Sequence, residues 1–213
     1  MNKLYAAFLI FISYFLLVTF LPKNVDSASK PTEKTSSDTS GKSEIAILAG
    51  GCFWCTESDM EKIPGVLTAV SGYTAGRVKD PTYKAVSNGL TGHAEAVRVV
   101  FDPKVISYEQ LLEKFWLTID PTVKNRQFCD RGSQYRSAIY YHNQKQEHIV
   151  RLGFKEIQKK LNTKIYTQVE AVSEFYNAED YHQDFYKKSP TRYYSYRKGC
   201  GRDNRLKEIW GSK

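Results

Sequence analysis

The sequence predicts an α+β protein in which strands and helices form a two-layer α/β sandwich. Short apolar stretches that alternate with a period of two, as strands do, recur from residue 44 onward. Longer stretches with apolar residues at helical spacing lie between them. The length from residue 44 to residue 213 suits one domain with a single core, and the sequence has no internal repeat.

Five strands are predicted, each bounded by glycine, proline or polar residues. They cover residues 44–49, 66–73, 95–101, 136–141 and 165–172. The third strand alternates most clearly, and its period of two places Glu95 on the same face as Val97 and Val99. A carboxyl group is therefore expected on an apolar face of the sheet.

Four helices are predicted from apolar residues three and four positions apart. They cover residues 56–63, 107–120, 144–161 and 178–188. Ser107 and Gln110 have the spacing of a capping box at the start of the second helix. Residues 74–88 and 126–135 are expected to be loops, and the tail from Ser189 is expected to be mostly irregular.

The first 43 residues are predicted to lie outside the domain at residues 44–213. Residues 1–28 resemble a signal peptide or an N-terminal membrane anchor, because an uncharged apolar run over residues 4–22 follows Lys3. Residues 29–43 are rich in Ser, Thr and Lys, as flexible linkers are. We therefore expect export to the periplasm or cell envelope, with a possible membrane tether through residues 4–22.

The net charge of +8 comes from scattered Lys and Arg residues, with a loose excess near the C-terminus. No nucleic-acid-binding motif accompanies it, so a basic surface without a nucleic-acid partner is expected. The four histidines lack metal-ligand spacing, and no second cysteine pair completes a zinc site. The sequence therefore predicts no metal site.

The segment from Gly50 to Cys55 carries the strongest chemical signal. It places Cys52, Phe53, Trp54 and Cys55 at the predicted junction of a strand and a helix. A thiol in the first turn of a helix is favoured as the thiolate by the helix dipole and by nearby backbone N–H groups. This pattern favours redox or catalytic use over the alternative, two small buried residues in a glycine-rich turn.

Other residues have a chemical and a purely structural interpretation. Burial would raise the pKa of Glu95 and let it hold a proton near neutral pH, whereas a solvated strand end would not. Asp130 and Tyr135 crowd one loop, which turn chemistry alone could explain. Tyr83 follows Pro-Thr in a loop and could serve packing. His93 flanks a strand end, so a Cys–His nucleophile pair is conceivable.

Several segments together resemble the peptide methionine sulfoxide reductase A family, over nearly all of residues 44–213. They are Gly51-Cys-Phe-Trp-Cys55, Pro81-Thr-Tyr83, Thr91-Gly-His-Ala-Glu95, Asp102-Pro103, Gln127-Phe-Cys-Asp-Arg-Gly-Ser-Gln-Tyr-Arg-Ser137 and Glu179-Asp-Tyr-His-Gln183. Their order and spacing make the resemblance specific. It implies a two-layer α/β sandwich with a mixed sheet and a ferredoxin-like core.

The resemblance also implies a role for each matching residue. Cys52 matches the nucleophile, and Phe53 and Trp54 match the pocket for the substrate methyl group. Glu95 matches the proton donor. Tyr83 and Tyr135 match the two hydroxyls that hold the sulfoxide oxygen, and Asp130 matches a polar position that supports the site.

The implied reaction is the reduction of the S epimer of methionine sulfoxide, free or in oxidised proteins, through a sulfenic acid and then a disulfide. Thioredoxin or a thioredoxin-like reductant would reset the disulfide, and the resemblance implies that neither a metal nor an organic cofactor is needed. The resolving thiol stays open between Cys55, slightly favoured, and Cys200 as an alternative or second relay. Cys129 could be a packing residue near the pocket. A monomer is expected.

Two rival interpretations belong to other classes. A thiol–disulfide oxidoreductase would use the C-x-x-C pair at a helix start but would not need Glu95 or the tyrosines. A membrane-tethered binding domain would keep its activity when Cys52 is replaced by serine. The combined motifs favour the reductase over both.

Overall fold

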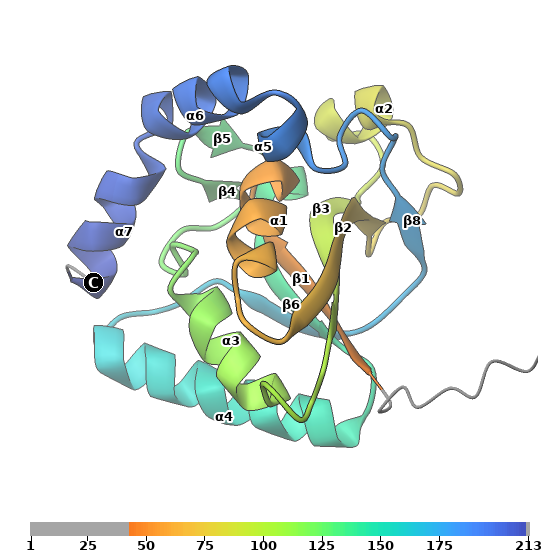
Figure 1. Ribbon diagram of the computed structural model, residues 1–213. Helices are drawn as coiled ribbons and strands as arrows, with labels where there is room; N and C mark the ends of the chain where they lie inside the picture. The colour runs from red at the N-terminus through yellow and green to blue at the C-terminus, as the bar shows by residue number, and fades with distance from the viewer. Residues whose placement is uncertain (1–42, 212–213) are drawn as a thin grey trace, which may run out of the picture. The chain divides into compact units, whose positions relative to one another are not determined.

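A computed structural model describes residues 43–211, and its centre is a six-stranded sheet with the order β7-β6-β1-β3-β2-β8 (Figure 1). The strands of this sheet are β1 (Glu44–Gly50), β2 (Val66–Thr74), β3 (Ala94–Phe101), β6 (Ser137–Tyr141), β7 (Gln168–Ala171) and β8 (Phe175–Asn177). The three helices packed on the sheet are α1 (Phe53–Glu61), α3 (Tyr108–Trp116) and α4 (Gln144–Leu161).

The ferredoxin-like core is confirmed by the connections of its elements. In chain order it contains β1, α1, β2, β3, α3 and β6. Strand β1 pairs antiparallel with both β3 and β6, and β2 pairs antiparallel with β3. Helix α4 then carries the chain to β7, which pairs parallel with β6. This last pairing makes the sheet mixed, as predicted.

Helices α1, α3 and α4 form the second layer, and the main hydrophobic core lies between them and the sheet (Figure 1). The predicted alternation in β3 holds, since Val97 and Val99 are buried in this core. Leu111 and Phe115 of α3 and Val150 of α4 meet them there. The other face of the sheet carries a smaller cluster, dominated by alanines.

Helix boundaries follow local capping chemistry. The Ser107 side chain accepts a hydrogen bond from the Gln110 N–H, and the Gln110 side chain binds back to Ser107, which confirms the capping box. Helix α4 has the predicted bounds. Helix α1 begins three residues before its predicted start, so Cys52 becomes its N-cap residue.

The predicted helix over residues 178–188 is wrong for most of its length. Only α5 (Phe185–Lys188) is helical. The Gln183 side chain accepts from Ser71 N–H and donates to Ser71 O, both at 2.9 Å, which pins an irregular turn against β2. The predicted strand at residues 165–172 shortens to β7, and β8 was not predicted.

The prediction of an irregular tail from Ser189 is also wrong. The tail forms α6 (Pro190–Gly199) and α7 (Arg202–Trp210), with Pro190 in the first turn of α6. The two predicted loops contain short elements as well. These are α2 (Tyr83–Ser87), β4 (Arg126–Gln127), β5 (Asp130–Arg131) and η1 (Ser133–Tyr135).

The predicted signal peptide or anchor and nearly all of the predicted linker lie outside the described residues. Among the helices of residues 43–211, none combines the length and the apolar composition that a membrane span requires.

Candidate active site

The chain turns sharply from β1 into α1 at Gly51 and Cys52. Gly51 has φ of 86°, and a Cβ atom there would lie 2.5 Å from Cβ of Gln127, so only glycine fits. The Cys52 carbonyl accepts hydrogen bonds from the N–H groups of Cys55 (3.1 Å) and Thr56 (3.3 Å). The turn therefore fixes Cys52 at the N-terminus of α1, as the sequence predicted.

Glu95 lies directly against this turn, at the start of β3. Its Oε2 accepts a 3.0 Å hydrogen bond from the backbone N–H of Phe53, and the residue is 1% exposed. Burial raises the pKa of this carboxyl to about 8, although the hydrogen bond from Phe53 favours the charged form. The predicted desolvation of Glu95 is therefore present, and the carboxyl holds a proton at neutral pH.

Cys52 and Cys55 are both buried free thiols within hydrogen-bonding contact. Burial and then Cys55 raise the pKa of Cys52 well above its usual value, which is opposite to the thiolate expected from the helix dipole alone. The hydrogen bond from Cys52 lowers the pKa of Cys55 to about 7, and Arg202 favours its charged form too. Of the two thiols, Cys55 is therefore the one whose charged form this arrangement favours.

Tyr83 and Tyr135 lie half-buried near Glu95 and Cys52. Burial, followed by Glu95, raises the pKa of Tyr83 to about 12 and raises that of Tyr135 as well. Both phenols therefore keep their protons and can donate hydrogen bonds. The N–H of Tyr83 donates to Glu179 Oε1 at 2.8 Å, which fixes the start of α2 beside the site.

Phe53 and Trp54 form an apolar wall next to the thiols, completed by residues from the C-terminal part of the chain. Trp54 stacks on Phe185 with ring centroids 3.8 Å apart, and its indole N–H donates to His182 Nδ1 at 2.9 Å. Burial lowers the pKa of His182 to about 4, so this ring is neutral. The sequence assigned no role to His182, although it lies within the motif Glu179–Gln183.

Asp130 lies on β5 and meets Tyr196 of α6, a residue that the sequence analysis missed. The Tyr196 hydroxyl donates to Asp130 Oδ2, and Tyr196 lowers the pKa of Cys52 slightly against the larger effect of burial. Burial raises the pKa of Asp130, against the effect of this hydrogen bond. No signal in the sequence separates Tyr196 from the other fourteen tyrosines.

The remaining two cysteines form a disulfide between Cys129 and Cys200. Cys129 is exposed and bonded, so its interpretation as a packing residue is wrong. Cys200, a candidate resolving thiol, is bonded to Cys129 in this structure, whereas Cys55 is free.

His93 does not form a pair with Cys52. Its Nδ1 accepts from the Gly76 N–H at 3.1 Å, and its Nε2 lies 2.7 Å from the Val78 carbonyl. Both ring nitrogens therefore hold the backbone of the loop after β2.

Arg202 of α7 is buried next to the turn that carries Cys52, and 2% of it is exposed. Its guanidinium donates to the carbonyls of Gly50 (3.3 Å) and Thr118 (2.7 Å) and lies 4.5 Å from the Phe128 ring centroid. The last helix is therefore anchored to the residue that precedes the Gly51–Cys52 turn.

The site geometry agrees with the comparison to known proteins. A family model described as peptide methionine sulfoxide reductase matches residues 44–213. The chain belongs to this family. It is therefore an oxidoreductase that reduces methionine sulfoxide.

Curated relatives agree with this assignment. The chain is 50% identical over 186 residues to the peptide methionine sulfoxide reductase MsrA/MsrB of Vibrio cholerae, covering 86% of this chain but only 49% of that relative. It is 47% identical to MsrA of Bacillus subtilis, covering 82% of this chain and 99% of the relative. It thus spans about half of the two-part Vibrio protein and nearly all of the Bacillus reductase.

Solved structures show the same fold. The reduced form of Mxr1 from Saccharomyces cerevisiae is 36% identical with a TM-score of 0.66, covering 70% of this chain and 87% of that one. Methionine sulfoxide reductase A of Corynebacterium diphtheriae is 32% identical with a TM-score of 0.63. The match covers 70% of this chain and 76% of that one.

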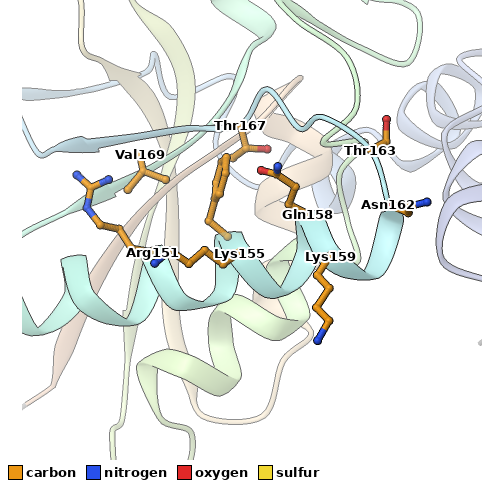
Figure 2. A pocket seen from close by; sticks show the side chains of 9 residues that line it. Arg151, Lys155, Gln158, Lys159, Asn162, Thr163, Thr167 and Val169 are labelled. Atoms are coloured by element: carbon orange, nitrogen blue, oxygen red, sulfur yellow. The ribbon is translucent and has the colours of Figure 1, made fainter.

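A wide hollow of about 850 Å³ lies elsewhere on this reductase, between α4 and β7 (Figure 2). Arg151 and Lys155 line it from the helix, and Thr167 and Val169 line it from the strand side. It contains no thiol, carboxyl or phenol group, so none of the reductase chemistry resides there.

Proposed function

We propose that this protein reduces the S epimer of methionine sulfoxide, free and in oxidised proteins, with Cys52 as the nucleophile. One observation carries the proposal. The protonated Glu95 binds the turn that presents Cys52, through the 3.0 Å hydrogen bond from Phe53. A proton donor beside a sulfur nucleophile is what sulfoxide reduction requires, because a sulfoxide sulfur is a poor electrophile until its oxygen is protonated.

The neighbouring residues suggest how the substrate lies. Its methyl group would pack against Phe53 and Trp54, because these rings form the apolar wall beside Cys52. Its oxygen would face Glu95 and the phenols of Tyr83 and Tyr135, which remain protonated donors. Asp130 would support the polar side of the site.

The first chemical step moves the sulfoxide oxygen to Cys52. Glu95 protonates the oxygen as the sulfur of Cys52 attacks the substrate sulfur, and the proton of the Cys52 thiol passes to Cys55. The hydroxyl then moves from the substrate sulfur to the Cys52 sulfur as the new S–S bond and the substrate S–O bond break, so methionine leaves and Cys52 becomes a sulfenic acid. The hydrogen-bonding contact between Cys52 and Cys55 supports this proton transfer.

The second step forms a disulfide. Cys55 attacks the sulfenic acid of Cys52, water leaves, and a Cys52–Cys55 disulfide forms. A thioredoxin-like dithiol then supplies two electrons and two protons to restore both thiols. The contact between Cys55 and Cys52 supports Cys55 as the resolving thiol, with Cys200 as a second relay or the alternative.

The apolar run at residues 4–22 supports the further proposal that the protein is exported to the periplasm or cell envelope, and tethered there if this segment is retained. Fractionation of cells that express the full chain tests the location. Recovery in the cytosolic fraction would exclude export.

The reaction is tested with the full-length protein, dithiothreitol and separated epimers of methionine sulfoxide. We expect consumption of the S epimer alone, and none by Cys52→Ser. Ser58→Ala, a change at another buried position of α1, should retain the activity and so control for folding. A folded protein that reduces neither epimer would contradict the proposal and favour disulfide exchange instead.

A further inference from the structure

The sulfurs of Cys129 and Cys200 and the carboxylate of Asp130 meet at one place near the surface. The three ligand atoms that they offer lie within 4.8 Å of one another. The two cysteines are joined as a disulfide although they are 71 positions apart in the sequence. Zinc-site motifs place their cysteines in close pairs, so spacing along the chain gives no sign of this group.

The carboxylate of Asp130 is held in the orientation that a metal ligand needs. Its Oδ2 accepts a hydrogen bond from the Tyr196 hydroxyl, while Oδ1 lies 3.7 Å from the sulfur of Cys129. In a tetrahedral zinc site, a sulfur ligand and a carboxylate oxygen lie about 3.5 Å apart, because zinc is about 2.3 Å from sulfur and about 2.0 Å from oxygen. The observed separation is close to this value. Ligating carboxylates in metal sites are themselves hydrogen-bonded, as Asp130 is to Tyr196.

Both cysteines lie in turns, so their sulfurs have room to separate once the disulfide is reduced. Cys129 lies in the turn between β4 and β5, and Cys200 directly follows α6. A Cβ atom added at the next residue, Gly201, would meet no atom within 4 Å, so the chain has open space there. Cys129 is exposed and Cys200 is partly exposed. A dithiol and a metal ion from solvent can therefore reach them.

We propose that reduction of the Cys129–Cys200 disulfide creates a Zn²⁺ site, with the two thiolates and Asp130 Oδ1 as protein ligands and water as the fourth ligand. A dithiol attacks the disulfide, becomes a disulfide itself and leaves two thiols, so the electrons balance. Zn²⁺ then binds both sulfurs and releases their two protons. Two thiolates with one carboxylate favour zinc, whereas Mg²⁺ and Ca²⁺ prefer oxygen ligands alone.

The charges around this site suit the ligand set. Two thiolates and one carboxylate exceed the charge of Zn²⁺, so the occupied site carries a net negative charge. The guanidinium of Arg202 lies 4.5 Å from the ring centroid of Phe128, the residue before Cys129. Its positive charge offsets the excess negative charge of the bound group.

The test measures metal binding by the full-length protein with Cys52→Ala and Cys55→Ala in every sample, which leaves Cys129 and Cys200 as the remaining cysteines. The oxidised protein is compared with protein reduced by dithiothreitol, which is then removed by gel filtration under nitrogen because it binds zinc itself. Co²⁺ is the probe, since its thiolate charge-transfer absorption reports sulfur ligands. Displacement of Co²⁺ by Zn²⁺ then gives the zinc affinity. No sulfoxide is used, so failure of the proposed reaction would leave this result unaffected.

We expect each reduced chain to bind a single Co²⁺ with thiolate absorption, and the oxidised chain to show no such absorption. Cys200→Ser should remove about half of the absorption and weaken zinc binding about 100-fold, because one sulfur ligand is lost. Asp130→Asn should keep the absorption but weaken zinc binding about tenfold or more, and Tyr196→Phe should weaken it about tenfold. Asp180→Asn, a change of an exposed carboxylate outside this group, should bind zinc like the parent.

Bound zinc should also slow re-formation of the disulfide, because both sulfurs are then occupied as ligands. Thiols that remain after addition of an oxidant, counted by alkylation with and without Zn²⁺, measure this protection. The protein with all four cysteines and its Asp130→Asn variant are titrated alongside. The same loss of about tenfold is expected between them, so the test does not depend on the changes at Cys52 and Cys55.

Three results would overturn the proposal. One is a reduced protein that binds Zn²⁺ with a dissociation constant above about 1 μM, which is weaker than a site of three protein ligands should be. Another is Co²⁺ binding without thiolate absorption, since the cysteines would then not be ligands. The third is an Asp130→Asn variant with the zinc affinity of the parent, which would remove the carboxylate from the site.

Discussion

The backbone N–H of Phe53 donates a 3.0 Å hydrogen bond to Oε2 of Glu95. The bond links the N-terminus of α1 in the helical layer to the start of β3 in the sheet, so the nucleophile and the carboxyl are held where the two layers meet. It favours the charged carboxylate, but burial outweighs it and the pKa of Glu95 rises to about 8. The site therefore combines a fixed carboxyl position with a retained proton.

This pKa predicts how the reaction depends on pH. Glu95 donates a proton below about pH 8 and loses that capacity as the pH rises through this value. Single-turnover reduction of S-methionine sulfoxide should therefore fall above pH 8. Glu95→Gln should lower the rate about 10²-fold or more at pH 7, because an amide cannot transfer the proton. An unchanged rate in this variant, measured by methionine release, would remove Glu95 from the mechanism.

The same group predicts a change in stability. The pKa of Glu95 in the folded protein, about 8, lies above the ordinary value of 4.5. The contribution of the neutral Glu95 carboxyl to the free energy of unfolding is therefore fully present below about pH 4.5 and is lost as the pH rises through 8. Glu95→Gln avoids this loss. Urea unfolding should show Glu95→Gln more stable than the parent at pH 9, by on the order of 5 kcal/mol, and equally stable at pH 4. Glu109→Gln, an exposed change on α3, is the control, and a gain shared by this control would contradict the assignment.

The two phenols should contribute separately to the reaction. Tyr83→Phe and Tyr135→Phe each remove one donor near Glu95 and leave the ring. Each should lower the single-turnover rate, by roughly 10²-fold if the donor contacts the oxygen as charge develops there. Tyr166→Phe, an exposed tyrosine before β7, should match the parent. Equal rates for all three variants would mean that Glu95 alone activates the oxygen.

Gly51 should be intolerant of a side chain. Gly51→Ala would place a Cβ 2.5 Å from Gln127 Cβ at a φ of 86°, so either the backbone or Gln127 must move. We expect a loss of stability of about 2 kcal/mol or more, measured by thermal unfolding, together with lower activity. Gly199→Ala in α6 meets no atom within 4 Å and should be neutral or stabilising. Similar losses in both variants would refute this account.

The sequence predicted the elements whose apolar residues repeat on one side. Helix α4 and strand β3 were found because Val150, Val97 and Val99 face one common core. Helices α6 and α7 were missed because their exposed sides are aromatic and basic, and because they hold the domain through single buried anchors such as Tyr193 and Arg202. Such anchors leave no periodic signal.

The site was predictable where its residues lie in contiguous motifs, and its electrostatics were not. Proximity to a helix start predicted a thiolate at Cys52, but burial and Cys55 raise its pKa. The pairing of Cys129 with Cys200 depends on contacts across 71 residues of chain, and no spacing rule fixes such a pair.

The position of Arg202 has a consequence for the order of events during synthesis. Its guanidinium fills the space behind Gly50 and Thr118, and it belongs to the last helix. A ribosome makes the Gly51–Cys55 turn about 150 residues before it makes this arginine. The catalytic turn therefore lacks this contact until α7 has been made. Cys52, Cys55 and Cys129 are also made well before Cys200, so Cys129 is without its disulfide partner during most of this time.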